Sequence, residues 1–122
     1  MAKKILFVDG DETMARNVAG MLQEMGYDVQ LATSGMKALD AFYSHSADYD
    51  LVVTDQGMPD MSGLLLAQRL IRKRPDIPIV LLTGLDGEFQ TRARESSGIR
   101  GFAGKPINQT ELSQVIENAL KG

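Results

Sequence analysis

The chain has 122 residues, an apolar fraction of 43% and a formal net charge of −3 at pH 7. This length gives room for one domain, residues 1–122, and no apolar run approaches the roughly 20 residues that span a bilayer. The absence of cysteine excludes disulfides, thiolate metal sites and a cysteine nucleophile. We therefore expect a cytoplasmic protein with no signal peptide and no membrane contact, and the acidic balance argues against contact with nucleic acid.

Short apolar runs alternate with segments of helical periodicity along the whole chain. The expected order is strand Ile5–Val8, helix 14–25 ending at Gly26, strand Val29–Leu31, a helix after Ser34, strand Leu51–Thr54, a helix from about Ser62 to Pro75, strand Ile79–Leu82, a weakly patterned segment 87–97, strand Gly101–Ala103 and a helix around 112–120. Uninterrupted apolar runs of this length are typical of strands buried on both faces of a parallel sheet.

Capping residues and apolar stripes support the expected helices. Met14, Met21 and Met25 recur at helical spacing in the first helix, and we expect them in the core. Asn108 and Glu111 have the spacing of a reciprocal capping pair at the start of the last helix.

Strand–helix alternation repeated five times predicts an α/β fold. We expect a flavodoxin-like, doubly wound parallel sheet of five strands in the order 2-1-3-4-5, with five helices on its two faces. In that order the switch point lies between strands 1 and 3, so a ligand is expected beyond the carboxyl ends of these two strands.

Polar side chains follow four of the expected strands, namely Asp9, Asp55, Thr83 and, after Gly104, Lys105. Because the carboxyl ends of parallel strands lie at one edge of the sheet, these side chains are expected to converge. Two neighbouring carboxylates repel each other unless a cation lies between them, and oxygen ligands suit Mg²⁺. A hydroxyl and an ammonium beside that ion are what a transferring phosphoryl group requires, and an aspartate can itself be the nucleophile.

Several motifs in the sequence resemble those of a known protein family. The stretch Asp55–Pro59, with Gly63 eight residues after the aspartate, resembles the phosphoacceptor loop of two-component response regulator receiver domains. Thr83-Gly84 resembles the family's hydroxyl residue followed by a small one. Lys105-Pro106 resembles its lysine followed by a cis-proline, and Phe102 falls where the family keeps a switching aromatic. The residues of these motifs are most similar to those of receivers attached to hybrid sensor histidine kinases.

The resemblance implies a role for each of these residues. Asp55 is the implied phosphoacceptor, and Asp9, Asp55 and the backbone carbonyl of Gly57 are the implied ligands of Mg²⁺. Thr83 is expected to bind a phosphoryl oxygen and Lys105 to pair with the phosphoryl group. The implied partners are a histidine kinase or phosphotransfer domain and a downstream protein bound through the fourth helix, fifth strand and fifth helix. The implied activity is at most self-catalysed phosphoryl transfer.

The chain departs from the family at Gly10. Receivers usually carry two adjacent acids after the first strand, and the second is commonly a metal ligand. Here glycine takes that position, and the next acids are Asp11 and Glu12. Asp11 either reaches the ion or caps the first helix. We therefore expect a Mg²⁺ site that is weakened, with Pro59, Gly63, Gly84 and Pro106 in structural roles around it.

Two other functions fit parts of the sequence. Asp9-Gly10-Asp11-Glu12-Thr13 also matches the Asp-x-Asp-x-Thr motif of haloacid-dehalogenase-like phosphatases, but that function leaves Asp55 and its loop unexplained and lacks a later pair of acids. Alternatively, Gly10 marks a degenerate receiver that acts by protein binding without phosphorylation.

Overall fold

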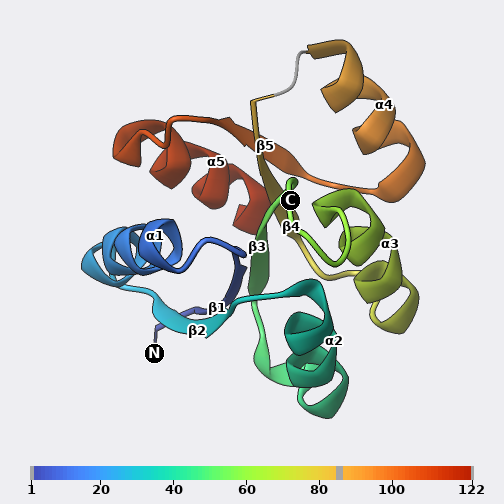
Figure 1. The fold of residues 1–122 in the computed structure, drawn as a ribbon, viewed down its shortest axis with the longest axis horizontal. Coiled ribbons are helices and arrows are strands. Elements are labelled where there is room, and N and C mark those ends of the chain that lie inside the picture. The colour runs from blue at the N-terminus through green and yellow to red at the C-terminus, as the bar shows by residue number, and fades with distance from the viewer. Residues whose placement is uncertain (1, 85–86, 122) are drawn as a thin grey trace.

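The computed structural model describes residues 2–84 and 87–121, which form one sheet with helices on both faces (Figure 1). The elements in chain order are β1 (Lys4–Val8), α1 (Glu12–Glu24), β2 (Asp28–Ala32), α2 (Gly35–Ser44), the short 3₁₀ helix η1 (Ser46–Asp48), β3 (Leu51–Asp55), α3 (Gly63–Lys73), β4 (Ile79–Thr83), α4 (Gly87–Ser97), β5 (Gly101–Gly104) and α5 (Gln109–Lys121). No helix among the described residues is both long and apolar enough to cross a membrane.

The sheet has five parallel strands in the order β2-β1-β3-β4-β5, which confirms the predicted flavodoxin-like topology. Val8 lies opposite Thr54, and Asp55 lies opposite Leu82. Because of this register, the residues at the ends of β1, β3 and β4 reach the same edge of the sheet.

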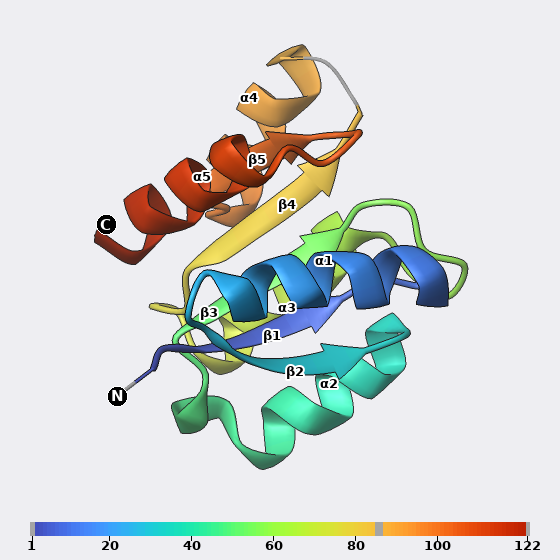
Figure 2. The same ribbon diagram turned by 90° about the vertical axis from the view of Figure 1, so that its left-hand side faces the viewer.

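Each strand contributes side chains to two hydrophobic cores, because successive residues of a strand point to opposite faces. Helices α2, α3 and α4 cover one face, and α1 and α5 cover the other (Figures 1 and 2). Leu6 and Val52 belong to the first core, whereas their neighbours Phe7 and Val53 belong to the second. The continuous apolar runs in the sequence therefore arise from strands that are buried on both faces.

The prediction that the methionines of the first helix form its core was wrong in part. The buried stripe of α1 consists of Ala15, Val18 and Leu22, whereas Met14 keeps 40% of its surface exposed. At about 100° per residue, Met14 lies at the border of this stripe and not at its centre. The predicted end of the helix is correct, since Gly26 has a φ of +97° that glycine adopts easily.

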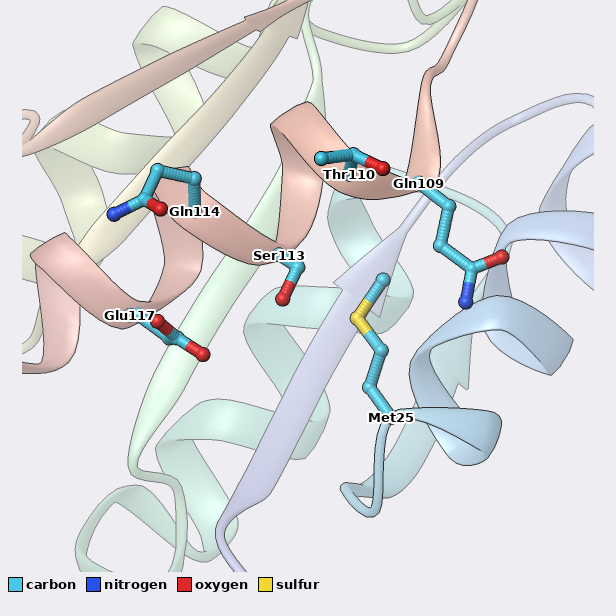
Figure 3. A pocket seen from close by; sticks show the side chains of 6 residues that line it. All are labelled: Met25, Gln109, Thr110, Ser113, Gln114 and Glu117. Carbon is cyan, nitrogen blue, oxygen red and sulfur yellow. The ribbon is translucent and has the colours of Figure 1, made fainter.

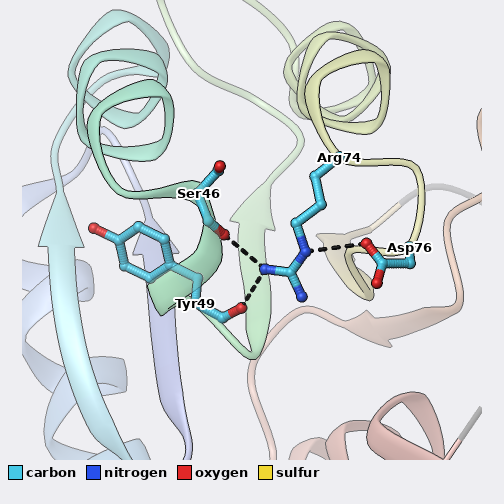
Figure 4. Close-up of polar contacts among 4 residues, drawn as sticks. All are labelled: Ser46, Tyr49, Arg74 and Asp76. Atoms are coloured by element: carbon cyan, nitrogen blue, oxygen red, sulfur yellow. Dashed lines mark hydrogen bonds and ion pairs between the residues drawn. The ribbon is translucent and has the colours of Figure 1, made fainter.

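Arg74 joins the end of α3 to the segment that leads into β3 (Figure 4). Its Nη1 donates hydrogen bonds to the carbonyl oxygens of Ser46 (2.7 Å) and Tyr49 (2.6 Å), and its Nε donates to the Asp76 carboxylate at 3.1 Å. The side chain fixes the residues that precede β3, the strand that ends in the candidate site.

Candidate functional site

Two aspartates lie side by side at the carboxyl edge of the sheet. Asp9 directly follows β1, Asp55 ends β3, and only 4% of the surface of each residue is exposed. A pocket of about 350 Å³ opens between them and is also lined by Gly10, Asp11, Gly57 and Pro59. Sequence reasoning therefore placed the two acids and the loop glycine correctly at one rim.

A second pocket, of about 320 Å³, lies on the other side of Asp55. It is lined by Asp55, Gly57, Thr83, Gly84 and Lys105, among others. The Lys105 ammonium forms an ion pair with the buried Oδ1 of Asp55. Asp55 thus stands between an acidic pocket and a pocket with a hydroxyl and a cation.

Burial and charge both act on Asp9. Burial raises the pKa of its carboxyl above the ordinary value, and the neighbouring charge of Asp55 adds to the rise. A hydrogen bond from the Asp11 N–H to Oδ1 of Asp9, 3.0 Å long, opposes it. The Lys105 ammonium offsets part of the cost of burying two carboxylates together. A cation in the acidic pocket, or protonation, would relieve the rest.

The acidic pocket has a lining that fits Mg²⁺, since it contains the carboxylates of Asp9 and Asp55 and the loop residue Gly57, whose carbonyl is the expected third ligand. This is an all-oxygen donor set, which the ion prefers. Asp11 also lines this pocket, but its Oδ1 accepts hydrogen bonds from the N–H groups of Thr13 (3.1 Å) and Met14 (3.2 Å) and so caps α1. Within residues 2–84 and 87–121, no three acidic or histidine side chains converge on a point that could hold a metal ion.

The loop after Asp55 is held against the start of α3. A side chain on Gly63 has no room, because its Cβ would lie 2.3 Å from the carbonyl oxygen of Asp55. The Gln56 side chain accepts a hydrogen bond from the N–H of Leu64 at 2.9 Å. Gly63 is therefore required eight residues after Asp55, and Gln56 is a bracing residue that sequence reasoning did not identify.

Asp60 attaches the same loop to a different helix. Its Oδ1 and Oδ2 accept hydrogen bonds from the N–H groups of Gly35 (3.1 Å) and Met36 (2.9 Å), at the start of α2. These bonds lower the pKa of the Asp60 carboxyl, and the bond from Met36 has the largest effect. Local sequence gave no signal for this contact, because the two partners lie 24 and 25 residues away.

The connection between β5 and α5 positions Lys105. The Lys105–Pro106 peptide is cis. The Asn108 side chain accepts a hydrogen bond from the N–H of Glu111 (2.9 Å), so half of the predicted capping pair is present. In place of the second bond of the pair, from the N–H of Asn108 to the Glu111 side chain, that side chain accepts a hydrogen bond from the N–H of Gly104 at 2.8 Å. Glu111 thus ties the start of α5 to the residue before Lys105.

Phe102 lies outside both pockets. It is half-buried on β5, packs against the core beneath α4, and has the guanidinium of Arg94 5.3 Å from its ring centroid. Sequence reasoning did not identify Arg94 as its neighbour. Segment 87–97, where the apolar pattern is weakest, nevertheless forms α4.

A larger pocket, of about 450 Å³, lies between the end of α1 and α5 (Figure 3). Its lining consists of Met25, Gln109, Thr110, Ser113, Gln114 and Glu117. None of the convergent groups Asp9, Asp55, Thr83 and Lys105 contributes to this lining. These four groups line the two smaller pockets beside Asp55 instead.

Comparison with known proteins identifies the class. The sequence model of the response regulator receiver domain matches residues 5–117. The chain belongs to this family and is a receiver domain of two-component signalling.

Individual relatives include a chemotaxis protein and a sensor kinase. The CheY homologue of Campylobacter jejuni is 31% identical over 120 residues, 96% of this chain and 92% of the relative. The sensor kinase CckA of Brucella abortus is 28% identical over 117 residues, 96% of this chain but 12% of the kinase. A crystal structure of a receiver domain protein from Clostridium thermocellum has a TM-score of 0.90 at 28% identity, covering 98% of this chain and 94% of that one. This chain thus spans most of some relatives and a small part of others.

Proposed function

We propose that residues 1–122 act as one phosphoacceptor unit in which Asp55 takes a phosphoryl group from a histidine kinase or phosphotransfer domain. The observation that carries the proposal is the position of Asp55 between an acidic pocket and the Thr83–Lys105 pocket. In the transfer, a carboxylate oxygen of Asp55 forms the new P–O bond as the P–N bond of a phosphohistidine breaks, and the electron pair returns to the imidazole nitrogen.

Some residues around Asp55 would bind the metal ion, and Lys105 would neutralise negative charge. Asp9, Asp55 and the Gly57 carbonyl would hold Mg²⁺, which supplies positive charge for the carboxylates and the phosphoryl oxygens. Lys105 pairs with Asp55, and this contact supports the proposal that its ammonium would pair with the phosphoryl group. Because Gly10 contributes no carboxylate, we propose that this chain binds the ion more weakly than a receiver with two adjacent acids.

We propose that phosphorylation changes the conformation of this domain, and that the domain acts in the cytoplasm. Thr83 would move toward the phosphoryl group, and Phe102 would turn inward behind it. The open space around Gly84, where a Cβ would meet nothing within 4 Å, leaves room for this movement. The changed surface of α4, β5 and α5 would then bind a downstream protein.

The alternatives have less support. A phosphatase would need Asp11 as its acid–base group, but that carboxylate caps α1. A degenerate receiver is favoured by one observation, the glycine at position 10 where receivers usually carry a second acid next to Asp9. The test below separates this alternative from the main proposal.

Beryllofluoride with Mg²⁺, a phosphoryl mimic, provides the test. We expect amide shifts across residues 84 and 87–104 in the native chain, no shifts in Asp55→Asn, and shifts confined to the site in Lys105→Ala. A native chain without any response would favour the degenerate receiver. A full response in Lys105→Ala would contradict the coupling role of Lys105.

A further inference from the structure

Helices α2 and α3 present an exposed face that the phosphoacceptor chemistry does not use. Three of the exposed large apolar side chains among the described residues lie on these helices. They are Met36 and Tyr43 on α2, with 53% and 50% of their surfaces exposed, and Leu65 on α3 with 38%. Exposed apolar side chains gathered on one part of a surface mark interaction sites more often than scattered ones do.

The geometry of the two helices joins these side chains into one surface. Met36 and Tyr43 are seven residues apart, so they lie on one side of α2 about two turns from each other. That side faces α3, because the Lys73 ammonium lies 6.0 Å from the centroid of the Tyr43 ring. Arg69 is one turn before Lys73 on the same side of α3, and Leu65 is one turn before Arg69.

This surface is positively charged, although the chain as a whole is acidic. Helix α3 carries Arg69, Arg72 and Lys73 and has no acidic residue, whereas the whole chain has a net charge of −3. On the neighbouring side of α2, Lys37 and Asp40 offset each other. The carboxylate of Asp60, near the start of α2, is occupied by backbone N–H groups.

We propose that the α2–α3 face, defined by Met36, Tyr43, Leu65, Arg69 and Lys73, docks an acidic amphipathic helix of another protein. Apolar residues of the partner would cover Met36 and Tyr43, and flanking glutamates or aspartates would pair with Arg69 and Lys73. Met, Tyr and Arg are residue types enriched in protein interfaces, and two adjacent helices accept the apolar side of a third. This docking surface is separate from α4, β5 and α5 and does not depend on phosphorylation of Asp55.

The probe is a synthetic helix of about 18 residues, or five turns, with leucines on one side and glutamates beside them. A peptide of the same composition in scrambled order, and one with lysine in place of glutamate, are its controls. We expect the patterned acidic peptide alone to shift the amide signals of residues 36–44 and 65–73. Shifts centred elsewhere, or equal binding of the three peptides, would overturn the proposal.

Matched variants separate this surface from general electrostatic attraction. The pair Arg69→Glu and Lys73→Glu is expected to weaken binding by about tenfold or more, whereas Lys3→Glu with Arg16→Glu, an equal change of net charge at other exposed positions, should change it by less than about twofold. Likewise, Met36→Ser should weaken binding and Met14→Ser, on α1, should not. Equal losses within either pair would contradict the assignment.

Two further measurements exclude other occupants. Sedimentation with phosphatidylglycerol vesicles, and light scattering of the chain alone, should show neither vesicle binding nor self-association. Binding to vesicles in place of the peptide would assign the face to a membrane, and self-association lost in the Arg69 and Lys73 variants would assign it to a second copy; either result overturns the proposal. Asp55→Asn should bind the peptide as the native chain does, so failure of the phosphoacceptor proposal leaves this test intact.

Discussion

Replacing Gly10 by aspartate restores the acid that this receiver lacks, and its effect should reverse sign with Mg²⁺. The new Cβ would lie 3.2 Å from Cδ of Pro59, so the proline must move by a few tenths of an ångström. The new carboxylate joins Asp9 and Asp55 at the rim. A like charge about 4 Å away costs about 1 kcal/mol in water and about 4 at an effective dielectric of 20. Because Gly10 is exposed, we expect a loss near the lower value without metal.

The gain with Mg²⁺ follows from binding linkage. At 100 times its dissociation constant, the ion stabilises the fold by about 2.7 kcal/mol, and near the dissociation constant by only about 0.4. For a chain of this length, 1 kcal/mol corresponds to a shift in melting temperature of about 3–6 °C. We expect the native chain to shift little at millimolar Mg²⁺, and Gly10→Asp to start lower and rise more.

Thermal melts across a Mg²⁺ series, with Gly10→Asn as the control, measure this difference. The asparagine has the shape of aspartate without its charge, so it should show the steric cost but rise no more than the native chain. If the native chain is already strongly stabilised by Mg²⁺, and Asp11→Ala removes that increment, Asp11 is a metal ligand and the account of the acidic pocket is wrong.

Three further contacts, those of Arg74, Asp60 and Arg94, are tested by substitution. Arg74→Met should lower the free energy of unfolding by about 1–3 kcal/mol through its two hydrogen bonds to carbonyl oxygens, whereas loss of the exposed partner in Asp76→Ala should cost less than about 0.5; equal losses in denaturant melts would contradict this. Asp60→Ala should cost about 1 kcal/mol at neutral pH, because the first two N–H groups of α2 lose their hydrogen-bond acceptor. Because the pKa of Asp60 is lowered in the folded state, its contribution is present at neutral pH and fades as pH falls through that lowered value, so mutant and native melts should converge in acid; a constant gap would refute the role of the charge. Arg94→Gln removes a cation–π contact worth about 0.5–1 kcal/mol, and the Phe102 ring signals should move toward those of the beryllofluoride form; unchanged signals would show that Arg94 does not hold the ring.

The sheet and its polar rim could be predicted because they depend on local patterns. Apolar runs located all five strands to within one or two residues, since strands buried on both faces admit few polar side chains. The order 2-1-3-4-5 followed from chain length and alternation. Asp9, Asp55 and Lys105 then met at one edge because parallel strands end together. The glycine at position 63 could be placed by resemblance, and the structure supplies its physical reason.

Contacts between distant segments could not be predicted in the same way. The bonds of Asp60 to α2 and of Arg74 to the segment before β3 join residues 24–28 positions apart, and no local pattern signals them. Glu111 had the spacing of a capping residue, but the N–H of Gly104 is its partner. Met14 fitted the apolar periodicity of the first helix, but the buried residues of α1 are Ala15, Val18 and Leu22. Each of these depends on how elements pack together and not on the order of residues within one element.

The central claim, that Asp55 accepts a phosphoryl group, is tested most directly by incubation with acetyl phosphate and Mg²⁺ followed by intact mass and peptide mapping. We expect the mass of a single phosphoryl group, located on Asp55 and dependent on Mg²⁺. Asp55→Asn should take up none, and Asp76→Asn, an exposed aspartate beyond the site, should take up as much as the native chain. Unchanged uptake in Asp55→Asn, or label on Asp9, would contradict the account.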